Sequence, residues 1–164
     1  MENKFYNFLI IIVNKCFKAV RFLSFWFVGT VIRFVRNNGF EKSLLLIRLD
    51  GIGDYVLFRN FISELKLSDK YGKHKITLVG NKVWSSLAET LDAEFIECFI
   101  WLDTHKFINN PFYRIRKLLK IRSIRYDVVI SPVFSREFLL TDSIVQVASA
   151  HQKIGSVGDL SNIS

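Results

Sequence analysis

An apolar run that stops at a glycine turn constrains this chain more than any other feature. Residues 44–49 are apolar except for Arg48, which predicts a strand buried on both faces of a parallel sheet. The turn Gly-Ile-Gly-Asp follows at residues 51–54, and apolar residues then recur at helical spacing from residue 54 to about 66. Such a turn between strand and helix lies at the carboxyl edge of the sheet, where open α/β proteins bind ligands. We therefore expect the functional site at this turn.

The two glycines of the turn, Gly51 and Gly53, are expected to allow positive φ angles and the close approach of a ligand. A dinucleotide-binding turn needs a third small residue three positions later, and Val56 occupies that position. The phosphate loop of nucleotide hydrolases needs Gly-Lys-Ser or Gly-Lys-Thr, which does not follow here. The sequence therefore argues against NAD, FAD and nucleotide-hydrolase sites.

Strands and helices are expected to alternate along the rest of the chain. We expect strands at residues 74–79, 94–102, 126–130 and 153–157, and helices at residues 83–91, 111–125 and 137–148. The basic residues of the helix at 111–125 predict a solvated face, with a second membrane contact as the alternative. The alternation predicts an α/β fold, a Rossmann-like parallel sheet with helices on both faces.

The N-terminal segment is apolar and basic. Residues 1–48 hold eight Lys or Arg against two Glu, so they carry +6 of the net charge of +8. The longest stretches without a charge are ten and eleven residues, whereas a membrane-spanning helix needs about 20 apolar residues. On a helical wheel an arc of about 120° holds Asn7, Asn14, Lys15, Lys18, Arg21, Gly29, Arg33 and Arg36. Inside this arc lie four apolar exceptions, Ile11, Phe22, Phe25 and Ile32. This pattern predicts an amphipathic helix that lies in the membrane interface, with its basic side chains on anionic headgroups.

Other interpretations of residues 5–36 stay open. A signal peptide fits poorly because Lys15, Lys18 and Arg21 interrupt the apolar core that such a peptide needs. A transmembrane helix with snorkelling basic side chains and a helix that packs on its own domain are the alternatives. Nucleic-acid binding is disfavoured because the aromatic residues follow helical spacing rather than the spacing of a stacking platform. The sequence Asn-Asn-Gly at 37–39 predicts a linker after the helix.

Several segments together resemble a known family. Leu-Leu-Ile-Arg-Leu-Asp-Gly-Ile-Gly-Asp at 45–54 resembles the opening of the family 9 glycosyltransferases, whose best-known members are the ADP-heptose:lipopolysaccharide heptosyltransferases. Later motifs agree in their order: Lys-Ile-Thr-Leu-Val-Gly at 75–80, Tyr-Asp-Val-Val-Ile at 126–130 and Ala-Ser-Ala-His-Gln-Lys-Ile-Gly at 148–155. The resemblance covers roughly residues 42–158. It implies the N-terminal, acceptor-binding half of a GT-B fold, and we expect the C-terminal donor domain to be absent from this chain.

The resemblance also implies an activity. Family members transfer a sugar from a nucleotide-sugar to a lipopolysaccharide core or a related surface-glycan acceptor, and this chain would supply only the acceptor-binding part. The alternative is a non-catalytic, membrane-associated Rossmann-like binding module or a truncated remnant. The expected domains are a basic membrane-anchoring helical segment at residues 1–38 and an acceptor-binding domain at residues 39–164.

The implied site residues all lie at the carboxyl edge of the predicted sheet. Asp54 matches the proposed base that takes the proton of the acceptor hydroxyl, with helix capping as its alternative role and Asp50 as the second choice. The expected substrate-binding residues are Gly51, Ile52 and Gly53 in the turn, together with Arg136 and Lys82 after other strands. A guanidinium such as that of Arg136 suits an acceptor phosphate or carboxylate.

The remaining expectations concern partners and location. No metal and no cofactor are expected, because His74, His105 and His151 have no Cys or carboxylate at ligand spacing. The nucleotide-sugar would be a substrate. The expected partners are a glycolipid or lipopolysaccharide-type acceptor, an anionic membrane surface and a separate donor domain, but no nucleic acid. The expected location is the cytoplasmic face of the inner membrane, for a peripheral or monotopic protein.

Overall fold

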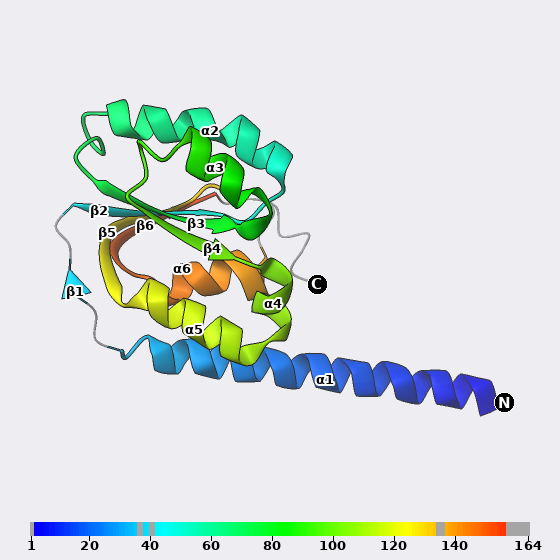
Figure 1. Ribbon diagram of the computed structural model, residues 1–164. Helices are drawn as coiled ribbons and strands as arrows, with labels where there is room; N and C mark the ends of the chain where they lie inside the picture. The colour runs from blue at the N-terminus through cyan, green and yellow to red at the C-terminus, as the bar shows by residue number, and fades with distance from the viewer. Residues whose placement is uncertain (1, 36–37, 40–41, 134–136, 157–164) are drawn as a thin grey trace.

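A parallel sheet with helices on both faces forms the centre of the molecule (Figure 1). The structure is a computed structural model that describes residues 2–35, 38–39, 42–133 and 137–156. The strands are β1 (Asn38–Gly39), β2 (Ser43–Arg48), β3 (Lys75–Asn81), β4 (Cys98–Leu102), β5 (Ile124–Ser131) and β6 (Ser149–Gly155). Each pairing between neighbouring strands is parallel.

The order of the strands is that of a doubly wound sheet. The five longer strands lie in the order β4-β3-β2-β5-β6, and the short β1 pairs with the beginning of β5. In chain order this arrangement is 3-2-1-4-5, the order of a Rossmann-like sheet. The expected α/β, Rossmann-like fold is therefore confirmed.

Helices cover both faces of the sheet. They are α1 (Glu2–Ile32), α2 (Ile52–Leu67), the 3-10 helix η1 (Lys82–Trp84), α3 (Ser85–Leu91), α4 (Thr104–Asn109), α5 (Pro111–Arg122), the π-helix η2 (Phe138–Asp142) and α6 (Ser143–Val147). In Figure 1, α2 and α3 lie on one face, α4, α5 and α6 lie on the other, and α1 runs along the outside of α5.

Strand β2 shows why the apolar run is continuous. Leu44 and Leu46 point into a core that α2 covers, whereas Leu45 and Ile47 point into the core under α5. Successive side chains of a strand point to opposite faces, so a strand covered on both faces needs apolar residues at every position. Each of these four side chains is fully buried.

The C-terminal part of α1 packs on the domain through the residues that interrupt the predicted polar arc. Phe25 and Ile32 are buried, and the ring of Phe22 stacks on Phe138 with 4.7 Å between centroids. Gly29 faces Val147 of α6, so a Cβ at Gly29 would stand 3.7 Å from a Val147 methyl group. The interpretation of a helix that packs on its own domain is thus confirmed for this part of α1. The beginning of α1 projects beyond the domain (Figure 1).

The opposite side of α1 exposes apolar side chains. We call Val20, Leu23, Phe27, Val31 and Phe34 the apolar row; they follow one another at helical spacing, and each is more than half exposed. No helix in the described part of the chain combines the length and the apolarity needed to cross a bilayer. Membrane contact by α1 stays a prediction.

Some element boundaries differ from those expected. The strand expected at 94–102 begins only at Cys98, because the N–H of Phe95 closes a turn on the carbonyl of Asp92. Helix α4 was not predicted; the side chain of Asp103 accepts a hydrogen bond from the N–H of Lys106 and starts this helix. The expected helix at 137–148 begins as the π-helix η2, and the expected linker contains β1.

Candidate active site at the switch point of the sheet

The carboxyl ends of β2 and β5 lie side by side where the strand order of the sheet reverses. After β2 the chain continues into α2 on one face, and after β5 it continues towards α6 on the other (Figure 1). Doubly wound proteins bind ligands in the crevice at this switch point. The turn expected to carry the site therefore lies at the position where the fold itself favours binding.

Arg48, the single charged residue of β2, holds both sides of this crevice together. Its guanidinium donates hydrogen bonds to the carbonyl of Pro132 at 3.0 Å and to the carbonyl of Asp54 at 3.3 Å. It also forms an ion pair with Asp50 at 2.9 Å and lies 4.5 Å from the ring centroid of Phe58. These contacts engage both terminal nitrogens of a buried side chain, so Arg48 positions the two loops, although its Nε has no hydrogen-bond partner among the described residues.

Asp50 is a paired residue of the turn. Burial raises the pKa of its carboxyl, the ion pair with Arg48 lowers it, and the neighbouring charge of Asp54 raises it again; the net change is upward. The carbonyl of Asp50 accepts a hydrogen bond from the indole N–H of Trp84 at 3.0 Å. These contacts assign Asp50 a structural role, and they show that the carboxylates of Asp50 and Asp54 are close enough to interact.

A cluster of aromatic rings supports the turn from the β3 side. The ring of Trp84 stacks on Tyr55 at 4.3 Å and meets Trp101 edge-on at 5.3 Å. Gly80 allows this arrangement, since a Cβ there would stand 2.4 Å from the Trp101 ring and 2.5 Å from the Trp84 ring. The side chain of Asn81 adds a hydrogen bond to the carbonyl of Leu49 at 3.1 Å. The backbone of the turn is thus fixed before any ligand binds.

The two glycines of the turn adopt ordinary backbone angles. Gly51 precedes α2 with φ −66° and ψ 169°, and Gly53 lies in the first turn of α2 outside the left-handed region. The expectation of positive φ angles is therefore wrong for both glycines. The expectation of open space holds for Gly53, because a Cβ there would have no atom within 4 Å.

Asp54 is exposed at the mouth of the crevice, in the first turn of α2. Among the described residues its carboxylate has no hydrogen-bond or ion-pair partner, and one of its oxygens would stand 3.7 Å from a Cβ at Gly51. The alternative role of a capping side chain is thus not found, although a negative charge in the first turn still favours the helix. A free carboxylate in this position can accept a proton from a bound hydroxyl group.

The structure describes one of the two basic residues that were expected at this site. Lys82 is exposed at the start of η1, and its charge helps to lower the pKa of Asp103, after the larger effect of the hydrogen bond from the Lys106 N–H. Lys82 therefore faces the end of β4, and no contact with Asp54 is found between these two described residues. Arg136 lies outside the described residues, so its expected position opposite Asp54 stays a prediction.

Apolar side chains are also exposed near the start of α2. Ile52, Val56 and Leu57 are exposed, and Leu57 is 83% exposed. The buried residues of α2 are Tyr55, Ile62 and Leu65. The switch point thus combines a free carboxylate with an open glycine position.

No group of three His, Cys, Asp or Glu side chains in the described ranges lies close enough together to hold a metal ion. The sequence reasoning missed the role of Arg48 and of the Trp84 cluster. A signal for Arg48 was present, because a lone charge in a strand buried on both faces needs several partners. Trp84 had no comparable signal, since its packing depends on Gly80 and Trp101 from two other strands.

Comparison of the chain with protein-family models, with curated proteins and with solved structures finds no match.

Proposed function

We propose that this chain is the acceptor-binding part of a glycosyltransferase that acts on a lipopolysaccharide core or a related surface glycan, with Asp54 as the base. The observation that carries the proposal is the exposed carboxylate of Asp54, which has no partner among the described residues and stands at the switch point beside the open position of Gly53. The resemblance of residues 45–54 to family 9 glycosyltransferases supports the same role.

The proposed chemistry assigns a task to each part of the crevice. A sugar hydroxyl of the acceptor lies against Gly53 and gives its proton to Asp54 as its oxygen attacks the anomeric carbon of the donor sugar. The bond from that carbon to the nucleoside diphosphate breaks, and the nucleoside diphosphate leaves with the bonding electron pair. Arg48 keeps the two loops at a fixed separation during this step. A nucleotide-sugar donor is bound mainly by a separate domain.

Membrane association completes the proposal. The apolar row of α1 lies among lipid acyl chains on the cytoplasmic face of the inner membrane, and the domain stands on the other side of the helix. A helix in this position keeps the crevice close to lipid-linked acceptors. The apolar row equally favours a second candidate function, a non-catalytic module that recruits a partner to the membrane.

The test uses substitutions at two exposed acidic residues of α2. In the 15N-labelled full chain, we expect a deacylated lipopolysaccharide core oligosaccharide to shift the amide signals of Gly51 and Gly53. Sugar transfer from radiolabelled nucleotide-sugars is then measured on membranes that contain the protein together with the separate donor domain. Asp54→Asn should lower the transfer rate by about 100-fold or more, because an amide cannot take the proton, while the amide shifts persist.

The matched control is Glu64→Gln, which removes the same charge from an exposed position of the same helix. This variant should transfer sugar at the normal rate. Unchanged transfer in Asp54→Asn would exclude Asp54 as the base. If, in addition, no amide of the turn responds to the oligosaccharide, the non-catalytic module is the better description.

A further inference from the structure

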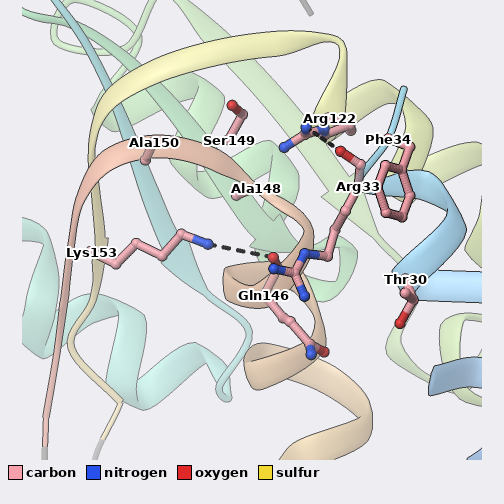
Figure 2. Close-up of a pocket in the computed structure, with 9 residues that line it drawn as sticks. All are labelled: Thr30, Arg33, Phe34, Arg122, Gln146, Ala148, Ser149, Ala150 and Lys153. Atoms are coloured by element: carbon pink, nitrogen blue, oxygen red, sulfur yellow. Dashed lines mark hydrogen bonds between the residues drawn. The ribbon is translucent and has the colours of Figure 1, made fainter. Parts of the chain in front are cut away.

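A second site lies at the amino edge of the sheet, away from the crevice. A pocket of about 430 Å³ opens where the residues after α1 and the end of α5 meet the beginning of β6. We call it the basic pocket, because Arg33, Arg122 and Lys153 reach into it from these three segments (Figure 2). Thr30, Gln146 and Ser149 add uncharged polar groups, and the described residues that line the pocket include no acid. Its volume is in the range of small-ligand sites.

No acidic side chain among the described lining residues neutralises the positive charges of the basic pocket. Burial lowers the pKa of Lys153, and the nearby charges of Arg33 and Arg122 lower it further. Burial and the charge of Arg33 likewise lower the pKa of Arg122. Such shifts mean that each cation is destabilised by its surroundings, so a bound anion would relieve the repulsion.

Two of the three cations also have structural partners. The Lys153 ammonium donates to the carbonyl of Val145 at 2.6 Å and to the carbonyl of Gln146 at 3.4 Å, at the end of α6. Arg122 donates to the carbonyls of Val35, Val147 and Arg33 and so ties the chain after α1 to the domain. Capping of carbonyl groups is therefore a sufficient explanation for these two side chains.

Capping of carbonyl groups does not explain the position of the Arg33 side chain. Its backbone carbonyl accepts from Arg122, but its side chain forms no hydrogen bond or ion pair with any residue that the structure describes. Figure 2 shows this side chain extending into the basic pocket, towards Gln146. A long cationic side chain that points into a pocket with two other cations is arranged to meet an anion.

The position of Phe34 identifies the source of that anion. Phe34 lines the basic pocket, is 86% exposed and is the last residue of the apolar row, two positions after the end of α1. The pocket is therefore continuous with an exposed apolar surface, as an amphiphilic ligand requires. A soluble phosphate would match the three cations but not the exposed ring beside them.

We propose that the basic pocket binds the phosphate of an anionic lipid headgroup while the apolar row lies among the acyl chains. The ligand is thus a phospholipid of the membrane surface, held by Arg33 and Lys153 with the charge of Arg122 behind them. This inference rests on the proposed membrane contact of α1, but it does not depend on glycosyl transfer.

The experiment is vesicle flotation of the full chain with phosphatidylcholine vesicles, with and without phosphatidylglycerol. Arg33→Gln should weaken binding to the anionic vesicles by about fivefold, since a cation at the surface contributes about 1 kcal/mol, and should leave binding to neutral vesicles within about twofold. Arg33 is exposed, so the substitution should not affect folding; the thermal transition checks this. Lys73→Gln removes one charge from the exposed turn between α2 and β3, outside the basic pocket, and is the matched control.

Each outcome has a defined meaning. A loss that is specific to Arg33→Gln and to anionic vesicles supports the basic pocket. Equal losses in Arg33→Gln and Lys73→Gln would indicate diffuse surface electrostatics and overturn the inference. Binding of inorganic phosphate to the protein without any binding to vesicles would also overturn the inference, because the pocket would then hold a soluble anion. The double variant Phe27→Ser/Phe34→Ser tests the membrane contact itself: if it floats as well as the wild type, the proposed contact of α1 fails as well.

Discussion

Arg114 shows how much one side chain contributes to the arrangement of this molecule. Its guanidinium is buried between the rings of Phe25 and Phe107, 4.5 Å from each centroid, and donates to the carbonyls of Phe107 and Leu139. Burial lowers its pKa to about 10. The contacts with aromatic rings and carbonyls offset part of the cost of removing this charge from water. Arg114 thereby joins α1, α4 and the segment before α6.

Lys153 allows a prediction at the same scale. Because burial and the charges of Arg33 and Arg122 lower its pKa, Lys153 should lose its proton at a lower pH than an exposed lysine does. An anion binds the protonated form better, so binding to phosphatidylglycerol vesicles should weaken as the pH rises from about 7.5 to 9.5, where the lipid phosphodiester keeps its charge. Vesicle flotation across this range measures the effect.

Lys153→Arg is the control for that measurement. A guanidinium keeps its charge throughout this pH range, so the variant should bind vesicles with little dependence on pH. An equal decline in the wild type and in Lys153→Arg would show that a group other than Lys153 titrates.

Elements with a simple periodic pattern were the ones that the sequence predicted well. The strands at β2, β3 and β5 and the helix α2 occupy nearly the expected ranges, because burial on one or two faces leaves a direct trace in the order of apolar residues. Short elements fixed by single side chains, such as α4 after Asp103, leave a weaker trace. The basic helix α5 was expected to have a solvated charged face, but Arg114 is buried. Its guanidinium donates a hydrogen bond to the carbonyl of Leu139, which belongs to a distant segment of the chain.

Helix α1 illustrates a pattern with two meanings. Its apolar residues occupy two opposite faces: Phe25 and Ile32 pack on the domain, and the apolar row lies opposite. A helical wheel shows an apolar majority with a few exceptions but cannot tell which apolar residues meet protein. Three of the exceptions inside the polar arc, Phe22, Phe25 and Ile32, pack on the domain.

Phe25 should therefore fasten α1 to the domain. Phe25→Ala removes a buried ring from the guanidinium of Arg114, and we expect it to lower the free energy of unfolding by about 3 kcal/mol. Backbone amides of residues 22–32 should exchange with deuterium faster, whereas those of β2 and β3 stay protected. Urea unfolding and hydrogen exchange followed by mass spectrometry measure both effects.

Phe27→Ala is the matched control, because it removes the same group from the exposed side of the same helix. Its effect on the free energy of unfolding should stay below about 0.5 kcal/mol. Comparable losses in the two variants would mean that α1 does not depend on its buried face.

At the scale of the whole molecule, the sequence predicted where the candidate site lies but not which residues support it. The glycine turn after β2 indicated the carboxyl edge, and the strand order places it at the switch point. The support by Arg48 and by Gly80 with its two tryptophans arises from contacts between strands that are distant in the sequence. The basic pocket was likewise missed, since Arg33, Arg122 and Lys153 come from three separate segments.

The two sites and α1 have a definite spatial relation. The end of α1 lies at the amino edge beside the basic pocket, and its beginning projects past the carboxyl edge, where α2 starts (Figure 1). A membrane along the apolar row would therefore extend beneath the crevice as well. In this orientation one helix holds the basic pocket on headgroups and the crevice beside the membrane surface.

The three tryptophans report on this orientation without added labels. Trp26 is half exposed on α1, whereas Trp84 is buried and Trp101 packs with it in the core on the other face of the sheet. We expect vesicles with brominated acyl chains to quench the fluorescence of Trp26 alone, because such quenching needs contact with the acyl region. Trp26→Phe should abolish the quenching while vesicle binding persists, since a phenylalanine still inserts. If quenching survives in Trp26→Phe, the sheet face covered by α2 and α3 lies against the bilayer. That result would contradict an orientation in which the apolar row faces the membrane.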